Sequence, residues 1–454
     1  MSPRFNKDFW GCCLLPIHRE SSLNMRIEQL ILRNFRCYAD TQFRFDRQFN
    51  LIVGQNGAGK TSLLQGLTVA AGSWFLGIRG YDSRNIQDDQ DVRRVTGMSG
   101  DTLQVSPQYP VAVEAAGTGL DDSPLEWGRS LDSKGGRTTQ KLAKGIKEQA
   151  SRAEGMVARQ EMVTLPLISS YGAGRLWVPS KDMRGESEAK ERLENNRLDG
   201  YLFSLDPRIN FSDLFRWLKE ERYVALEIGR DRFGFAAVKR AMCACLEDCI
   251  SVDYHVAERS LVVETHARGR QPFDLLSDGQ KSMLALVADI AFKAALLNPH
   301  LGERVLEETP GVVFIDELDL HIHPSWQRRL VTDLKKVFPS LQFFATTHSP
   351  QIVGETPPEQ IILLHRDGTW SRPRQTIGLS SNQVLEHIMG AEAVNRGMAH
   401  QFDAILELVE KGDFALARER ITQLRGSENF NFPELTEAEN YMSSIEESAR
   451  EAGA

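Results

Sequence analysis

The sequence predicts an α/β fold in which helices cover a mainly parallel β-sheet. Residues 312–315 and 342–345 are short, continuous apolar runs, which is typical of parallel strands buried on both faces. Residues 325–338 between them have helical character and complete a right-handed strand-helix-strand crossover. A third apolar run, residues 51–53, ends in a glycine-rich loop and is followed by helical apolar spacing. Together these observations favour an open sheet whose carboxyl edge collects the ligand-binding loops.

The other elements follow in order along the chain. Residues 1–24 carry no periodic pattern, and strand-like alternation begins at Met25. Strands are expected near residues 163–171, 252–256 and 261–266, and a long amphipathic helix should end at Leu297. Beyond Met389 the pattern is again helical, with an apolar stripe formed by Phe402, Ile405, Leu406, Leu408 and Val409.

We therefore divide the chain into five parts. These are an N-terminal extension (1–24), the first part of the α/β domain (25–120), an inserted helical or variable lobe (121–250), the second part of the α/β domain (251–390), and a C-terminal helical segment with an acidic tail (391–454). From Arg425 onward the sequence holds seven acidic and two basic residues, which predicts a loosely held acidic tail.

Composition excludes several classes of protein. The 454 residues include 54 Lys and Arg against 62 Asp and Glu, a net charge of −8, so the chain is not a generally basic nucleic-acid coat. The sequence contains no run of about 18 apolar residues, which a membrane-spanning helix would need. Residues 129–160 are locally basic but lack interleaved aromatic residues, which favours a solvated helix face over a nucleic-acid footprint.

The six cysteines and the absence of a secretory leader indicate a reducing cytoplasm. Cys243, Cys245 and Cys249 could suggest a metal or Fe–S site. They follow an apolar, alanine-rich helical pattern, however, and we expect Cys245 and Cys249 to share a helix face.

The glycine-rich loop carries the first recognisable chemistry. Its sequence fits G-x-x-x-x-G-K-[ST] between an expected strand and an expected helix, which makes a chance glycine loop improbable. Backbone N–H groups of such a loop turn inward around phosphate, and the helix dipole adds to the field. Lys60 should reach the β- and γ-phosphates, and Thr61 should bind Mg²⁺. The nucleotide-binding set is Gly54, Gln55, Asn56, Gly57, Ala58, Gly59, Lys60, Thr61 and Ser62.

Asp316 and Glu317 follow the apolar run 312–315, at the edge of the sheet where ligands collect. Asp316 would hold Mg²⁺, directly or through water, and Glu317 would activate the water that attacks the γ-phosphate. A surface Asp-Glu pair at the end of any strand is the plainer alternative, but the phosphate loop makes it improbable.

Two further motifs fit a nucleotide. Ser277, Gly279 and Gln280 stand just before a long helix, where a hydroxyl, an N–H and a helix N-terminus can face an anion. The chain already has one phosphate-binding loop. This second anion-binding turn therefore suits a nucleotide that is held by another copy of the protein. His348 follows a buried strand and can donate to the γ-phosphate or position water, whereas a lone histidine there would more often be structural.

In this order the motifs resemble the head of an ABC/SMC-type ATPase: Walker A, a Leu-Ser-x-Gly-Gln signature, Walker B with its glutamate, Leu318-Asp319 as a D-loop and His348 as the switch histidine. The resemblance implies ATP and Mg²⁺ as cofactors and a fold that combines a mixed sheet with a RecA-like parallel sheet. It also implies that Asp319 contacts nucleotide, and that two copies bury two ATPs between them, each site completed by Ser277 and Gly279 of the opposite chain. No Q-loop glutamine is evident, and Arg175 occupies about the expected place, so we expect it to sense nucleotide.

Residues 34–38 and 55–64 are more similar to RecF, SMC and OLD heads than to transporter subunits. Residues 170–175, 276–282 and 316–326 resemble the compact bacterial defence ATPases, which include PtuA of the Septu anti-phage system and its retron-associated relatives. The resemblance spans roughly residues 25–390. It implies a homodimer or higher oligomer, a PtuB-like HNH nuclease partner and, in some systems, a retron reverse transcriptase with its msDNA.

Three functions follow as alternatives. A defence ATPase would regulate a separate nuclease, a RecF- or Rad50-like clamp would bind DNA itself, and a transporter subunit would dock on a permease. The wide spacing of the motifs disfavours the transporter, and the absence of heptads between residues 62 and 275 disfavours Rad50. Too little chain follows His348 for an OLD-type nuclease domain. We therefore expect a cytoplasmic ATPase without intrinsic nuclease activity and without a membrane partner.

Overall fold

The computed structural model describes residues 25–99, 101–175, 196–391, 396–425 and 433–452, so the predicted N-terminal extension lies outside the described residues. The chain forms two units, Met1–Ser380 and Ser381–Ala454. The boundary between them falls somewhat before the head boundary that the sequence suggests.

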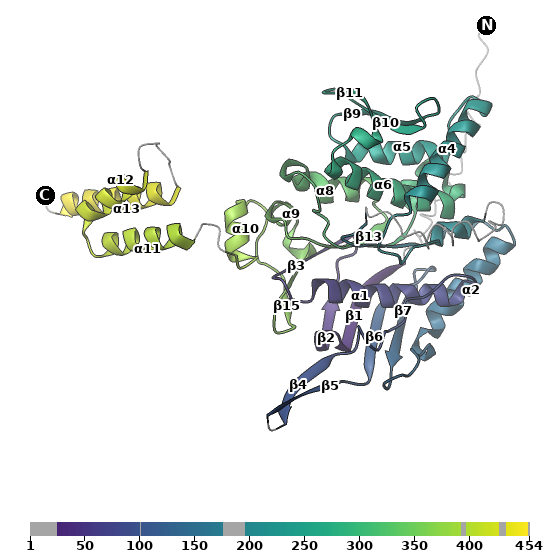
Figure 1. Ribbon diagram of the computed structural model, residues 1–454, viewed down its shortest axis with the longest axis horizontal. Coiled ribbons are helices and arrows are strands. Elements are labelled where there is room, and N and C mark those ends of the chain that lie inside the picture. Colours follow the sequence, from purple (N-terminus) through teal and green to yellow (C-terminus); the bar gives the residue numbers. More distant parts are fainter. Residues whose placement is uncertain (1–24, 100, 176–195, 392–395, 426–432, 453–454) are drawn as a thin grey trace, which may run out of the picture. The chain divides into compact units, whose positions relative to one another are not determined.

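A six-stranded sheet forms the centre of the first unit (Figure 1). Its strand order is β15 (Trp370–Ser371), β14 (Ile361–Leu364), β3 (Phe49–Gly54), β13 (Leu341–Thr346), β12 (Gly311–Ile315) and β8 (Leu167–Tyr171). All neighbours are parallel except β14 and β15. β3, β12 and β13 are buried along their whole length, as their continuous apolar sequences predict. The parallel sheet is therefore confirmed.

An antiparallel sheet packs beside it, in the order β2 (Tyr38–Arg44), β1 (Arg26–Phe35), β6 (Val111–Thr118) and β7 (Pro124–Leu131). Helix α1 (Lys60–Ala71) contacts strands of both sheets, and Figure 1 shows it between them. The buried amide of Gln342 on β13 joins the sheets directly, because it exchanges two 2.9 Å hydrogen bonds with the backbone N–H and C=O of Ile27. The fold is thus a mixed-sheet α/β architecture around one core.

Helix α6 (Asp278–Leu297) is buried over most of its length, as the long amphipathic pattern predicts. It packs with α4 (Phe211–Ile228) and α5 (Phe233–Cys245), and Figure 1 shows these helices across β3 and β13 from the antiparallel sheet. The remaining elements of this unit are β4 (Arg94–Ser99), β5 (Thr102–Pro107), α2 (Lys144–Ala158), β9 (Cys249–His255), β10 (Ser260–Thr265), β11 (Gly269–Pro272), α7 (Val305–Glu308), α8 (Pro324–Val337) and α9 (Pro350–Gly354).

The described residues of the range 121–250, expected as an inserted helical or variable lobe, contribute to several elements of the first unit. They supply β7 to the antiparallel sheet and β8 to the edge of the central sheet, and only α4 and α5 add helices beside α6. The locally basic stretch forms β7 and α2. Ile146, Ala150 and Ala153 are the buried residues of α2, so its charged positions form the solvated face that the pattern favours.

The prediction that Cys245 and Cys249 share a helix face is wrong. Helix α5 ends at Cys245, and Cys249 begins strand β9 after a turn. The thiol of Cys243 points at the carbonyl oxygen of Cys249, 3.4 Å from the sulfur. Among the described residues, no group of three or more His, Cys, Asp or Glu side chains could hold a metal ion.

A buried polar network joins α6 to strand β8. Tyr171 donates its hydroxyl to Oδ2 of Asp289 at 2.7 Å, and Nζ of Lys293 lies 2.8 Å from the same oxygen. Burial and the Asp289 carboxylate raise the pKa of Tyr171 well above its usual value, so the phenol remains a donor. The side chains of Lys293 and Asp289 are only 9% and 3% exposed.

Removing the lysine from this network should be costly. Lys293→Met leaves Asp289 as a buried carboxylate without its cation, and we expect the free energy of unfolding to fall by about 3–5 kcal/mol. Urea denaturation measures the loss. Lys144→Met is the matched control, since Lys144 forms an i, i+4 pair with Glu148 but both side chains are exposed. This exposed pair should change stability by less than about 1 kcal/mol. Equal losses in the two variants would contradict the role of burial.

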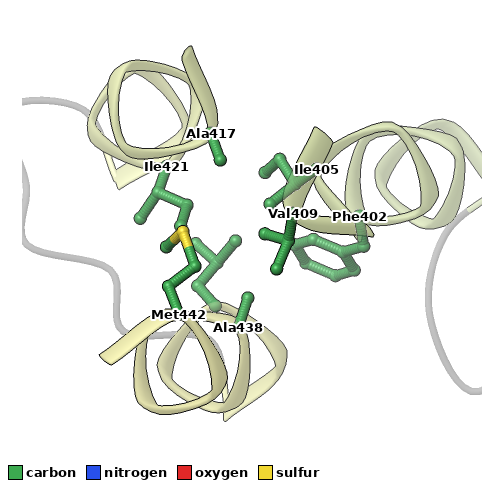
Figure 2. Close-up of a cluster of buried hydrophobic side chains, with 8 residues drawn as sticks. Phe402, Ile405, Val409, Ala417, Ile421, Ala438 and Met442 are labelled. Atoms are coloured by element: carbon green, nitrogen blue, oxygen red, sulfur yellow. The ribbon is translucent and has the colours of Figure 1, made fainter. Parts of the chain in front are cut away.

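The second unit consists of α10 (Ser381–His387), α11 (Arg396–Glu410), α12 (Phe414–Arg425) and α13 (Pro433–Ala452). Figure 2 shows side chains of α11, α12 and α13 directed toward one another. Phe402, Ile405 and Val409 of the predicted stripe are in this cluster, Leu408 packs against it, and Leu406 is 47% exposed.

The prediction of a loosely held tail is wrong over the described part of α13. Leu435, Ala438 and Met442 of this helix are buried in the same cluster as Ile421 of α12. The bidentate contacts of Arg425 with Glu439, at 2.9 and 2.7 Å, fix α12 to α13 as well. Throughout the described part of the chain, helices with the length and apolar character of a membrane span are absent.

Candidate nucleotide site

The glycine-rich loop joins β3 to α1, as the motif predicts, and its predicted residues run from the last residue of β3 into the first turn of α1. Gly59 must be glycine. Its φ of +99° is left-handed, and a Cβ atom there would lie 2.6 Å from the hydroxyl oxygen of Tyr38. That hydroxyl donates to the carbonyl oxygen of Gly59 at 3.1 Å. Tyr38 of β2 therefore packs against the loop at Gly59 and stabilises it through this hydrogen bond.

Lys60 is the first residue of α1 and is buried. Its ammonium donates to the carbonyl oxygens of Gly54 at 2.8 Å and Gln55 at 3.2 Å, so the charge lies within the loop. Burial lowers the pKa of Lys60, whereas the carboxylates of Asp316, Glu317 and Asp319 act in the opposite direction. A cation in this position can pair with phosphate oxygens.

Thr61 and Asp316, the two residues predicted to bind Mg²⁺, come together although 255 positions separate them. Thr61 Oγ1 lies 3.3 Å from Oδ2 of Asp316. Thr61 is exposed and Asp316 is partly exposed, so both oxygens are accessible. A hydroxyl and a carboxylate oxygen suit Mg²⁺, which takes few protein ligands and completes its shell with water and substrate phosphates. The residues present therefore fit the ion.

Glu317 follows Asp316 at the end of β12 and is partly exposed. Its backbone is left-handed, with φ of +51°, which is rare for a residue with a Cβ atom. The N–H of Glu317 donates to Oγ1 of Thr346 at 2.8 Å, and the hydroxyl of Thr346 donates to Oδ1 of Asp316 at 2.6 Å. Thr346 thus orders both acidic residues. Sequence reasoning missed it, although a threonine at the end of the neighbouring buried strand was a usable signal.

His348 lies beyond the end of β13, and its side chain is exposed. Asp319 holds this segment, since its Oδ1 accepts from the Thr347 hydroxyl at 2.6 Å and from the His348 N–H at 3.2 Å. Within one chain, Asp319 therefore links the segment after β12 to the segment after β13. A contact of Asp319 with nucleotide stays a prediction.

Ser277 caps α6 and forms a capping box with Gln280. Its side chain is exposed, and its hydrogen bonds run to Gln280 in the same turn. Gly279 packs so closely on the chain after β12 that a Cβ atom would lie 2.4 Å from the carbonyl oxygen of His321. In this turn, which we call the signature turn (residues 276–280), Gly279 is therefore tightly packed against the chain after β12, whereas Ser277 is exposed.

Arg175, which we expect to sense nucleotide, lies behind the two acidic residues. It is fully buried, and its guanidinium donates to the backbone carbonyls of Asp316 and Glu317. A contact of Arg175 with nucleotide stays a prediction. The sequence pattern located Arg175 near the site but gave no information on its orientation.

Comparison with known proteins agrees with an ATPase. Residues 29–227 match an AAA domain, and residues 168–354 match an AAA domain described as a putative AbiEii toxin of a type IV TA system. The retron Ec83 probable ATPase of Escherichia coli is 25% identical, and the match covers 84% of this chain and 79% of that protein. Septu protein PtuA of Bacillus thuringiensis is 24% identical, with 82% and 85% covered.

Among solved structures, the SMC head domain from Thermotoga maritima matches 77% of this chain and 98% of its own, with a TM-score of 0.39 and 14% identity. The match to the curated relatives extends well beyond the glycine-rich loop, since each covers more than four fifths of the chain. The chain is thus similar over most of its length to the retron ATPases and to Septu PtuA, and two overlapping stretches of it match AAA-domain models.

Proposed function

We propose that this protein is the ATPase of an anti-phage defence system, which dimerises around ATP and regulates a separate HNH nuclease. The observation that carries the ATPase mechanism is the 3.3 Å approach of Thr61 to Asp316, with Glu317 next to it. This contact brings the end of the glycine-rich motif together with the acidic residues that follow β12. The reaction is ATP plus water to ADP plus phosphate.

Each residue then has a distinct task. The loop of residues 54–62 binds the phosphates through its backbone, and Lys60 neutralises the β- and γ-phosphates. Thr61 and Asp316 hold Mg²⁺, which when bound offsets further phosphate charge. Glu317 accepts a proton from the attacking water, and the exposed imidazole of His348 donates to the γ-phosphate.

The exposed signature turn supports the proposed dimerisation. Ser277 and the N-terminus of α6 form an anion-binding surface, and in the proposed dimer this surface meets the γ-phosphate on the other copy. Asp319, next to that surface, would contact the same nucleotide. ATP then holds two copies together because both contribute positive groups to one triphosphate, and hydrolysis loosens them.

The nuclease is proposed to be a separate, PtuB-like chain, because the relatives include Septu PtuA and retron ATPases. A retron reverse transcriptase with its msDNA is a further partner in that setting, and we place the system in the cytoplasm. The three-helix cluster of the second unit is the proposed docking element, since its core is complete without the head.

Co-expression with the neighbouring gene product tests this function. The purified chain should hydrolyse ATP with Mg²⁺ and leave DNA intact, whereas the complex should cut nucleic acid. A truncation at Ser380 should keep ATP hydrolysis and lose the partner. Robust DNA cleavage by the isolated chain would refute a separate nuclease. Tight DNA binding by the chain alone, with no nuclease partner, would favour a RecF- or SMC-like repair function instead.

A further inference from the structure

Arg175 binds the peptide groups that carry the two acidic residues. Its Nη1 lies 3.0 Å from the carbonyl oxygen of Asp316 and 3.2 Å from that of Glu317, and its Nη2 lies 3.2 Å from the latter. A guanidinium holds its donors in a rigid planar fork, whereas an ammonium carries its donors at the end of a flexible stem and fixes the direction of two carbonyls less firmly. The guanidinium therefore fixes the orientation of two consecutive peptide planes.

The peptide of Glu317 needs such support. Its φ of +51° is an unfavourable conformation, and it persists only where the surroundings determine it. The carbonyl oxygen of Glu317 also accepts from the N–H of Leu320 at 3.1 Å, and its own N–H is held by Thr346. Arg175 provides two of the donors that reach this carbonyl, so its loss removes the largest share of that support.

The loop that carries Arg175 is itself anchored to the acidic strand end. The N–H of Asp316 donates to the carbonyl oxygen of Tyr171 at 2.7 Å, and the N–H of Gly172 donates to the carbonyl oxygen of Pro207 at 2.8 Å. The N–H of Ile209 donates to the carbonyl oxygen of Arg175 itself at 3.1 Å. The guanidinium is thus presented from a backbone that is fixed on both sides.

We propose that Arg175 is a positioning residue for ATP hydrolysis, which acts by holding Glu317 so that its carboxylate faces the attacking water. This inference rests on the proposed role of Glu317. It differs from a nucleotide-sensing role, because Arg175 would act through the two carbonyls that its guanidinium contacts. It also differs from a purely structural role, because its effect on the rate must pass through one side chain.

The test is a double-mutant cycle with Arg175→Lys and Glu317→Gln, in which ATP hydrolysis is measured in single-turnover and steady-state experiments. Arg175→Lys keeps the charge but loses the fork. We expect kcat to fall about 10–100-fold with KM changed less than about threefold, since a misplacement of about 1 Å is enough for such a loss. In the Glu317→Gln background the same substitution should change the residual rate little.

Arg129→Lys is the matched control. Arg129 is also fully buried, and it donates to the carbonyl oxygen of Thr139 at 3.0 Å and to Oδ1 of Asn85 at 2.7 Å. Burial lowers the pKa of both arginines to about 10, so both carry a buried charge at neutral pH. This control should lower the melting temperature and leave kcat within about twofold of the wild type.

Several results would overturn the proposal. One is that Arg175→Lys lowers the rate by the same factor in the Glu317→Gln background as in the wild type. Another is that Arg175→Lys no longer binds a fluorescent ATP analogue. A third is that the control Arg129→Lys lowers kcat as much as Arg175→Lys does. If Arg175→Lys does not fold, Arg175→Gln, which keeps a planar amide donor, takes its place. Failure of both to fold assigns Arg175 a structural role. If the wild type itself does not hydrolyse ATP, the proposed function fails first, whereas an active wild type with a neutral Arg175→Lys refutes this inference alone.

Discussion

Glu317→Gln should lower the rate of ATP hydrolysis about 10²–10⁴-fold while ATP binding is retained. The amide is nearly isosteric with the carboxylate but cannot accept a proton from water. The backbone contacts of this position, from Thr346 to the N–H and from Arg175 and Leu320 to the carbonyl, do not involve the side chain and should persist. The loss should therefore be confined to the chemical step.

Binding and turnover must be measured separately to test this expectation. Titration with a fluorescent ATP analogue gives the dissociation constant, and phosphate release gives kcat. Because hydrolysis no longer separates the copies, ATP should also trap a dimer that size-exclusion chromatography with light scattering detects. Glu359→Gln is the control, since Glu359 is an exposed glutamate of the same unit far along the sequence. Loss of ATP binding in Glu317→Gln would contradict its role as the base.

Much of the first unit could be predicted because its strongest signals are local. The apolar runs of β3, β12 and β13 identify strands buried on both faces, and the loop after β3 needs its glycines for its turn. Parallel pairing then brings the strand ends together, since Ile315 lies opposite Ala345 and Ala345 opposite Leu51. The approach of Thr61 to Asp316 follows from this register. Motif spacing was therefore sufficient to locate these two residues.

The support for these residues could not be predicted, because it depends on side-chain direction. Nothing in the sequence distinguishes an arginine that faces nucleotide from one that binds the backbone behind Glu317, as Arg175 does. The place of Thr346 at the end of a buried strand was a usable signal, but its hydrogen bonds to the two acidic residues that follow the neighbouring strand could not be predicted. In the second unit the acidic composition led to the wrong prediction of a loosely held tail. Helix α13 also has an apolar face, formed by Leu435, Ala438 and Met442, which is buried.

If two copies share each site, as we propose, two inactive variants can complement each other. Lys60→Met removes the cation from the glycine-rich loop, and Ser277→Arg places a long charged side chain on the exposed signature turn. Each variant alone should lose nearly all ATP hydrolysis. In a mixed dimer, however, one of the two sites contains both defects and the other contains none. Mixing two inactive proteins should therefore restore activity.

The size of the recovery is set by the symmetry of the dimer. At equal amounts half of the dimers are mixed and each has one intact site, so independent sites give roughly a quarter of the wild-type rate. Co-expression with two affinity tags ensures that mixed dimers form. Ser277→Thr keeps the hydroxyl and the helix cap, and it should remain close to wild type both alone and in the mixture. Mixed dimers that form but stay inactive would show that each chain builds its site alone, because only a site assembled from two chains can be repaired by exchange.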